Sequence, residues 1–283
     1  MGLSQFLNSV TRIVRAEQVG TVRGITRHVG WQFRRLTRAF PVELELSKSR
    51  LRAEEPSGVA ALVNALGMYD YNNMNLMQRA LREPGGIFLD VGANIGSYTL
   101  VASETGCPVM ALEPHPKTFR LLTENISLNG RANVRPINLA ASDGPGEVVF
   151  TDGSDPGLNH IVGDGENVPQ AIRVPATTLD ALCIELGLWP TVVKIDVEGH
   201  EPEVLAGFEM GLKHAELLII ENGEREAIRD AVGSRGFEGP FYYHHRSNIL
   251  RRIRPPVSED SVFVRRPVGD GGAPWGIADK AIE

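Results

Sequence analysis

The sequence has little that would support a protein held together by disulfides or structural zinc. It contains two cysteines, Cys107 and Cys183, and no Cys-x-x-Cys motif or Cys/His cluster. Cysteines this few cannot build a disulfide framework, so we expect a reducing, cytoplasmic setting.

Long apolar runs are also missing. No uninterrupted run approaches the ~20 residues that span a bilayer, and arginines recur through the N-terminus where a secretory signal would be apolar. The 283 residues, 42% of them hydrophobic, suit one large domain with an extension. We divide the chain into a basic helical extension (1–55), a catalytic domain (56–268) and a flexible tail (269–283).

Charge is distributed unevenly along the chain. Residues 1–40 hold seven arginines and one acid, Glu17, and so carry +6; since the whole chain carries −6, the remainder carries about −12. Nucleic-acid affinity comes largely from neutralising phosphates, so an acidic body predicts no nucleic-acid partner.

Apolar residues recur at helical spacing from Leu3 to Val14, beside Arg12 and Arg15. This spacing predicts a helix that docks on the body or on a second subunit of a homo-oligomer. The alternative is a helix at the inner membrane surface, with residues 1–40 making peripheral contact with anionic lipid.

From residue 86 onward, strand and helix patterns alternate. Buried strands are predicted at 87–91, 108–113, 134–140, 191–196 and 215–222, helices at 116–129, 178–186 and 224–234, and closing strands at 237–243 and 260–266. This order predicts an α/β fold with a mostly parallel sheet and helices on both faces. Ligands of such sheets bind beyond the carboxyl ends of the strands.

A glycine-rich turn, "FLDVGANIG", follows the first of these strands. A dinucleotide fingerprint would have a second glycine at Asn94, and the carboxylate of Asp90 would repel a pyrophosphate. Asp90 instead suits a phosphate-free, cationic cofactor such as S-adenosylmethionine. Glu113, at the tip of the second strand, is placed to accept hydrogen bonds from ribose hydroxyls.

Four segments in the order "FLDVGANIGSYTL", "ALEPHP", "NLAASDG" and "KIDVEGHE" resemble the FkbM family of S-adenosylmethionine-dependent methyltransferases, over about half the chain. The resemblance implies a class I methyltransferase, Rossmann-like, with a seven-stranded sheet and an antiparallel last strand. It also implies O-methylation of a sugar, glycan, glycolipid or secondary-metabolite hydroxyl. The implied cofactor contacts are Asp90, Gly92, Ala93, Asn94, Gly96 and Glu113, with Ala141, Ser142 and Asp143 near the adenine.

Methyl transfer to a hydroxyl needs an acceptor oxygen in line with the methyl group and a base for its proton. "DVEGHE" ends the fourth strand, beside the expected position of the methyl. Asp196 is the first choice for contacting the cofactor or the acceptor, and Glu198 and His200 are its titratable neighbours. The alternative is that Glu198 is a surface or helix-capping acid and that His200 is a helix-start residue with a local hydrogen bond.

Glu221 and Asn222 end the next strand, which lies beside the strand of Asp196 in sheets of this kind. Three oxygen ligands would then converge on a Mg²⁺ site, an arrangement that resembles catechol-type O-methyltransferases. The alternative is that Glu221 and Asn222 are turn and cap residues.

Two other functions are consistent with a Rossmann-like sheet. An NAD(P)-dependent oxidoreductase is disfavoured by the missing glycine at position 94 and the absence of a Tyr-x-x-x-Lys pair. A non-catalytic module that binds S-adenosylmethionine would keep the cofactor residues without turnover.

The polar loop 151–170, with His160 as a reserve base, is either a lid over the acceptor or a solvated loop.

Overall fold

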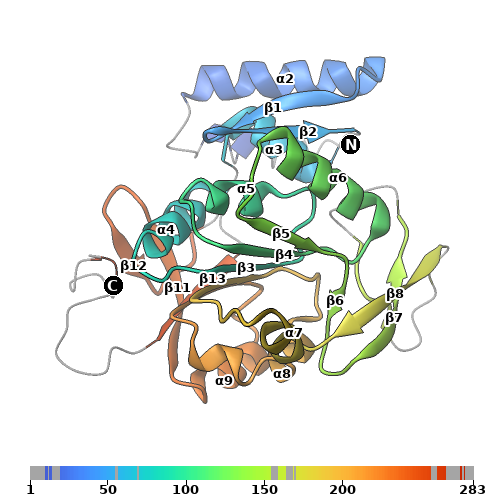
Figure 1. The fold of residues 1–283 in the computed structure, drawn as a ribbon. Helices are drawn as coiled ribbons and strands as arrows, with labels where there is room; N and C mark the ends of the chain where they lie inside the picture. The colour runs from blue at the N-terminus through green and yellow to red at the C-terminus, as the bar shows by residue number, and fades with distance from the viewer. Residues whose placement is uncertain are drawn as a thin grey trace.

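The computed structural model describes residues 10–11, 13–14, 20–54, 57–68, 70–153, 159–163, 168, 170–255, 260–265, 275 and 277. Its centre is a sheet with the order β12-β11-β13-β10-β9-β3-β4-β5 (Figure 1). The bounds are β3 Phe88–Val91, β4 Val109–Leu112, β5 Val134–Ile137, β9 Val192–Ile195, β10 Leu217–Glu221, β11 Phe237–His244, β12 Ile249–Arg251 and β13 Asp260–Arg265.

The five strands β10, β9, β3, β4 and β5 run parallel, as the alternation of strand and helix patterns predicts. β13 pairs antiparallel with β10, which confirms the predicted reversed last strand. The order reverses at β3, which has β4 on one side and β9 on the other. A crevice therefore opens beyond the carboxyl end of β3.

The sheet has eight strands, so the expected seven is corrected. The extra strand, β12, forms an antiparallel hairpin with β11. Asn248, in the left-handed conformation, turns the chain back, and Arg79 donates to its side chain. β12 has three residues and ends at the exposed Arg251, so it is too short for an apolar pattern to reveal.

Helices cover both faces of the sheet (Figure 1). One side carries α4 (Tyr71–Leu81), α5 (Ser97–Ser103) and α6 (Pro116–Leu128); the other carries α7 (Leu179–Leu186), α8 (Glu201–Ala206) and α9 (Glu226–Gly233). Each side buries its own apolar cluster against the sheet. The predicted α/β class with two covered faces is confirmed.

A second, three-stranded sheet of order β6-β8-β7 lies beside the main one. It consists of β6 (Ala140–Ala141), β7 (Gly146–Thr151) and β8 (Ala171–Thr177). The sequence predicts no strand at β8, because its apolar residues are interrupted by Arg173 and Pro175.

The N-terminal part contains α2 (Thr21–Thr37), a hairpin of β1 (Val42–Leu46) and β2 (Ser49–Ala53), and α3 (Gly58–Leu66). The hairpin is fixed to α6, because Asn125 Oδ1 accepts from Arg52 N at 2.7 Å and Asn129 Oδ1 from Arg50 N at 2.8 Å. Most of the helix predicted between residues 3 and 14 lies outside the described residues, and the proposed division at residue 55 stays a prediction.

The described part of the C-terminal segment is limited to two residues. Trp275 and Ile277 are both buried and belong to the apolar cluster of the α4–α5 side. Such contacts are not expected of a loose tail; the rest of 269–283 lies outside the described residues. None of the helices that the structure describes has the length and apolarity of a membrane span.

Candidate active site

A pocket opens beyond the carboxyl ends of β3, β4, β9 and β10, where the fold predicts a ligand. Its described lining contains seven carboxyl side chains and a single basic one, Lys194. The seven are Asp70, Asp90, Glu113, Asp196, Glu198, Glu221 and Asp260. Such a surface favours cationic or hydrogen-bond-donating ligands and disfavours phosphates.

Asp90 ends β3 at the floor of this pocket and is 1% exposed. Its Oδ2 accepts a hydrogen bond from Thr99 Oγ1 at 2.6 Å, whereas its Oδ1 has no hydrogen-bond partner in the described structure. Burial, offset in part by the Lys194 charge, raises the pKa of Asp90 to about 6. An unpaired buried carboxylate oxygen is costly, so it marks a place for a ligand that brings a donor or a positive charge.

The turn after β3 explains the glycine pattern. Gly92 has φ +82°, and a Cβ there would overlap the carbonyl oxygen of Asp196. Gly96 has φ +96°, and a Cβ there would lie 2.8 Å from the side chain of Leu122. Asn94 is also left-handed, at φ 52°, a conformation that asparagine tolerates. Asn94 can therefore stand where a dinucleotide fingerprint would have glycine.

Glu113 follows β4 and is held by two backbone amides. Its Oε2 accepts from Asn94 N and its Oε1 from His115 N, each at 2.9 Å. It is 6% exposed, and burial raises its pKa to about 7. Each carboxylate oxygen can accept a further hydrogen bond, which suits a pair of ribose hydroxyls.

The predicted adenine contacts are only partly brought together. Ala141 lines the pocket with Leu139 and Phe150. Ser142 is buried, but its hydroxyl lies 3.0 Å from His200 Nε2, and Asp143 is exposed; neither lines the pocket. The pocket contains the unpaired Oδ1 of Asp90, the side chain of Glu113 held by two backbone amides, and a glycine turn that lets a ligand approach the backbone. These features fit a cationic nucleoside such as S-adenosylmethionine.

The tip of β9 brings a lysine into the site. Lys194 is 2% exposed, and its Nζ donates to Asp196 Oδ2 at 2.6 Å and lies 4.8 Å from the ring centroid of Tyr98. The Tyr98 hydroxyl in turn donates to Asp70. Asp196, which lines the pocket, is thus fixed by a buried ammonium.

Three carboxylates meet at this end of the pocket. One oxygen each of Asp196, Glu198 and Glu221 lies within 4.8 Å of the others. Desolvation and the Asp196 charge raise the pKa of Glu198 to about 7 and that of Glu221 to about 9. Asp260 adds to this repulsion, since it pairs with Glu221 across β10 and β13.

Two of the predicted catalytic or metal residues lie apart from this group. His200 Nδ1 is 3.5 Å from Glu203 and its Nε2 bonds Ser142, and the ring does not line the pocket. Asn222 has φ 51° and its carbonyl accepts from Arg225 N, which suits the alternative of a turn residue. The third oxygen donor beside Asp196 and Glu221 is therefore Glu198 and not Asn222, which the sequence predicted.

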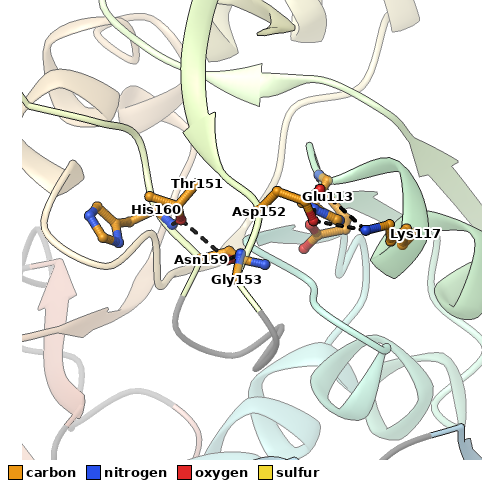
Figure 2. Close-up of polar contacts among 8 residues, drawn as sticks. Glu113, Lys117, Thr151, Asp152, Gly153, Asn159 and His160 are labelled. Carbon is orange, nitrogen blue, oxygen red and sulfur yellow. Dashed lines mark hydrogen bonds and ion pairs between the residues drawn. The ribbon is translucent and has the colours of Figure 1, made fainter. Parts of the chain in front are cut away.

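The described part of loop 151–170 lies beside the pocket. Asn159 and Ile161 line it, and Asn159 Oδ1 accepts from Gly153 N at 2.8 Å (Figure 2). Asp152 anchors the start of the loop, because it accepts from His115 Nε2 at 3.1 Å and Lys117 Nζ at 2.9 Å (Figure 2). His160 is close enough for its charge to lower the pKa of Glu198, although it does not line the pocket.

The sequence analysis missed several residues of the site. Lys194 interrupts the apolar strand "TVVKID", and a lone lysine in a buried strand is a signal that could have been used. Glu201 is fully buried and accepts from Val197 N and Gly199 N, which holds the loop that carries Glu198. Asp70 and Asp260 had no local signal, because they come from distant segments.

Comparison with known proteins adds a family, a relative and structural neighbours. The model of the methyltransferase FkbM domain matches residues 90–249, more than half of the chain. The hexuronic acid methyltransferase AglP of Haloferax volcanii is 34% identical over 143 residues, which cover 49% of this chain and 56% of that protein. The match therefore spans little more than half of the relative's length.

Among solved structures, the methyltransferase FkbM from Methylobacillus flagellatus aligns with a TM-score of 0.44 and 16% identity, covering 64% of this chain and 43% of that one. TYW2 from M. jannaschii, in complex with AdoMet, aligns with a TM-score of 0.40 and 14% identity, covering 80% of this chain and 87% of that one.

Proposed function

Since the chain belongs to the methyltransferase family defined by the FkbM domain, we propose that it transfers the methyl group of S-adenosylmethionine to a hydroxyl of a sugar or glycan. The observation that carries the cofactor assignment is the buried, unpaired Oδ1 of Asp90 beside Glu113. The sugar class of the acceptor is supported by the relative named as a hexuronic acid methyltransferase.

In this proposal the cofactor lies across the tips of β3 and β4. Asp90 accepts from the ammonium end, Glu113 from the ribose hydroxyls, and the adenine lies toward Ala141. When bound, S-adenosylmethionine supplies an electrophilic methyl group on a sulfonium. The acid-lined end at Asp196 and Glu198 then faces that methyl.

The residues of this end have different proposed roles. Asp196 is held by Lys194 at 2.6 Å, so it positions the acceptor hydroxyl by accepting a hydrogen bond. Glu198 is the proposed base, because a carboxyl with a pKa of about 7 is ionised in part at neutral pH and still takes a proton well. With the donor bound, the hydroxyl oxygen would take the methyl group, the electrons of the carbon–sulfur bond would stay on sulfur and leave neutral S-adenosylhomocysteine, and Glu198 would accept the hydroxyl proton.

The same carboxylates also suit the predicted Mg²⁺. Asp196 and Glu221 would be ligands as the sequence suggests, with Glu198 in place of Asn222. Oxygen donors of this kind are those that Mg²⁺ prefers. The metal would stabilise the ionised acceptor oxygen. Full activity after exhaustive treatment with EDTA would eliminate this version and leave Glu198 as the base.

The test incubates the full chain with radiolabelled S-adenosylmethionine and separate glycan, glycolipid and small-molecule fractions of cells. Label in a carbohydrate-containing fraction, lost with Glu198→Gln, supports the proposal. Binding of S-adenosylhomocysteine with no label in any fraction would instead indicate a non-catalytic module.

We place the reaction in a reducing, cytoplasmic compartment, since Cys107 and Cys183 are both free thiols in the interior.

A further inference from the structure

Helix α2 is apolar on two opposite sides. Its inner side buries Gly24, His28 and Trp31, and the helix packs on α3. The Trp31 ring meets Phe40 edge-on, with centroids 5.4 Å apart. Figure 1 shows α2 at the periphery of the molecule, beyond α3 and the β1–β2 hairpin.

The outer side of α2 presents large apolar residues to solvent. Val22, Val29, Phe33 and Leu36 are 80%, 55%, 66% and 83% exposed. At about 100° per residue these four fall within roughly 60° of the helix circumference, opposite Trp31. Scattered exposed apolar residues are normal, but four in one stripe mark a contact surface.

Arginines lie to one side of this stripe. At about 100° per residue, Arg23 and Arg34 fall roughly 80–100° around the helix from Phe33. Both are exposed, as is Arg38 just after the helix, and the first turn of the helix contains no acid. The stripe therefore lies on the +6 part of the chain, while the remainder carries about −12. A second copy of this chain would bring its own arginines against these, so charge disfavours a symmetric dimer through this face.

We propose that the outer face of α2 docks on an anionic bilayer surface. The four apolar side chains would enter the boundary between headgroups and acyl chains, and the arginines would meet lipid phosphates. The acidic body would be repelled from the same surface, which orients the molecule with α2 toward the lipid. One helix with a narrow stripe gives reversible, salt-sensitive binding rather than stable anchoring.

This orientation has a consequence for the pocket. Val59 and Leu62 of α3 line the pocket, and Leu62 packs on the same small apolar cluster as Ile25 of α2. The bilayer would thus lie one helix away from a wall of the site, within reach of an acceptor carried on a lipid. That last step rests on the proposed function, whereas docking of α2 does not.

The test is co-sedimentation of the full chain with vesicles of phosphatidylcholine alone or mixed with phosphatidylglycerol. We expect binding to the mixed vesicles that is lost at high salt. A Phe33→Ser/Leu36→Ser double variant should bind roughly tenfold more weakly, because two apolar side chains no longer enter the lipid. Ile184→Ser, at a 59% exposed position on α7, is the matched control and should bind as the wild type does.

Three results would overturn the proposal: no sedimentation of the wild type with anionic vesicles, equal binding of the double variant, or equal loss with Ile184→Ser. A wild-type dimer that the double variant converts to a monomer would show a second copy on this face instead, and would also overturn it. Unchanged binding of S-adenosylhomocysteine verifies that each variant is folded, and it keeps this result separate from any failure of the methyl-transfer assay.

Discussion

The pocket and the outer face of α2 depart from ordinary folding preferences in opposite directions. The pocket buries charge: Asp90 and Glu113 are 1% and 6% exposed beside several more acids. The face of α2 exposes apolar side chains, with Leu36 at 83%. Burial of the charges costs stability unless a ligand relieves it, whereas the exposed apolar side chains cost little stability and instead mark a contact surface. The comparison teaches that the two surfaces fit ligands of different chemistry, a cationic nucleoside in one case and an anionic lipid surface in the other.

The two regions also differ in rigidity of placement. The acids of the pocket are fixed by parallel strand ends and by backbone donors such as Asn94 N. The apolar stripe is positioned only by the packing of the opposite, inner side of α2, which buries Trp31 and its neighbours. Substitutions in the pocket should therefore strongly alter methyl transfer and the affinity for the methyl donor, whereas substitutions on the stripe should leave both unchanged.

The largest effect is expected from the acid-lined end of the pocket. Glu198→Gln removes the proposed base and should lower kcat by roughly 10²–10⁴-fold, with little change in the affinity for S-adenosylhomocysteine. Steady-state kinetics with isothermal titration calorimetry would measure both. Glu203→Gln, on the neighbouring helix α8 and outside the pocket lining, is the control. Equal loss in both variants would remove Glu198 from its role.

A smaller effect, with opposite signs in two assays, is expected from Asp90→Asn. Loss of the charge should weaken S-adenosylmethionine binding by roughly 10- to 100-fold, the typical value of a hydrogen bond to a charged group. The ligand-free protein should melt at a higher temperature at pH 8, because a buried carboxylate is no longer ionised there. Glu83→Gln, at an exposed acid, should change neither. Lower melting temperature and unchanged affinity would contradict the assignment of Asp90.

Stability should also depend on pH in a direction set by the pocket. Asp90 and Glu113 have folded-state pKa values of about 6 and 7, above those of the unfolded chain. The folded state therefore holds protons more tightly, and its stability falls as pH rises from about 4 through 7. We expect the ligand-free melting temperature to fall by on the order of 5 °C between pH 5.5 and 8.

Bound S-adenosylmethionine should reduce this fall, because its positive charges favour the ionised acids. Differential scanning fluorimetry over this pH range measures both curves. A melting temperature that rises with pH in the ligand-free protein would show that other groups dominate.

The smallest effect on the pocket is expected from the stripe. Phe33→Ser and Leu36→Ser should leave the affinity for S-adenosylhomocysteine within about twofold and the melting temperature nearly unchanged, since surface substitutions cost little. Trp31→Ala, on the inner side of the same helix, should destabilise by about 3–5 kcal/mol, as buried aromatic truncations do. Thermal and chemical denaturation would compare the two sides directly; equal loss from both would show that the stripe is part of the core.

The parallel half of the fold was predictable because its strands are mostly apolar runs that alternate with helical patterns. Asp90, Gly92, Glu113 and Asp196 were predictable for the same reason, since each lies near or just after the end of such a strand. The strands β2, β8 and β12 were not, because their apolar residues are few or interrupted by Arg50, Arg173 and other polar residues.

The full acidity of the pocket could not be predicted, since it depends on register between distant segments. Asp260 faces Glu221 only because β13 inserts antiparallel beside β10. Asp70 is held in the pocket lining by the hydrogen bond that it accepts from the Tyr98 hydroxyl. No local sequence pattern indicates the contact of Asp260 with Glu221 or that of Asp70 with Tyr98. His200 was a reasonable choice from its neighbours in "DVEGHE", but side-chain direction in a tight turn follows from the turn geometry and not from sequence spacing.

The backbone carbonyl of Asp196 packs directly against Gly92. This main-chain contact links the acid-lined end of the pocket to the turn after β3. Engineering a new acceptor preference by transplanting the segment around residue 196 would therefore disturb the turn that holds the methyl donor. Diversification is easier at lining side chains away from this turn, such as Leu62 and Asn159. A library confined to those positions should yield altered selectivity without loss of donor affinity, whereas one that moves the main chain at 196 should lose both together.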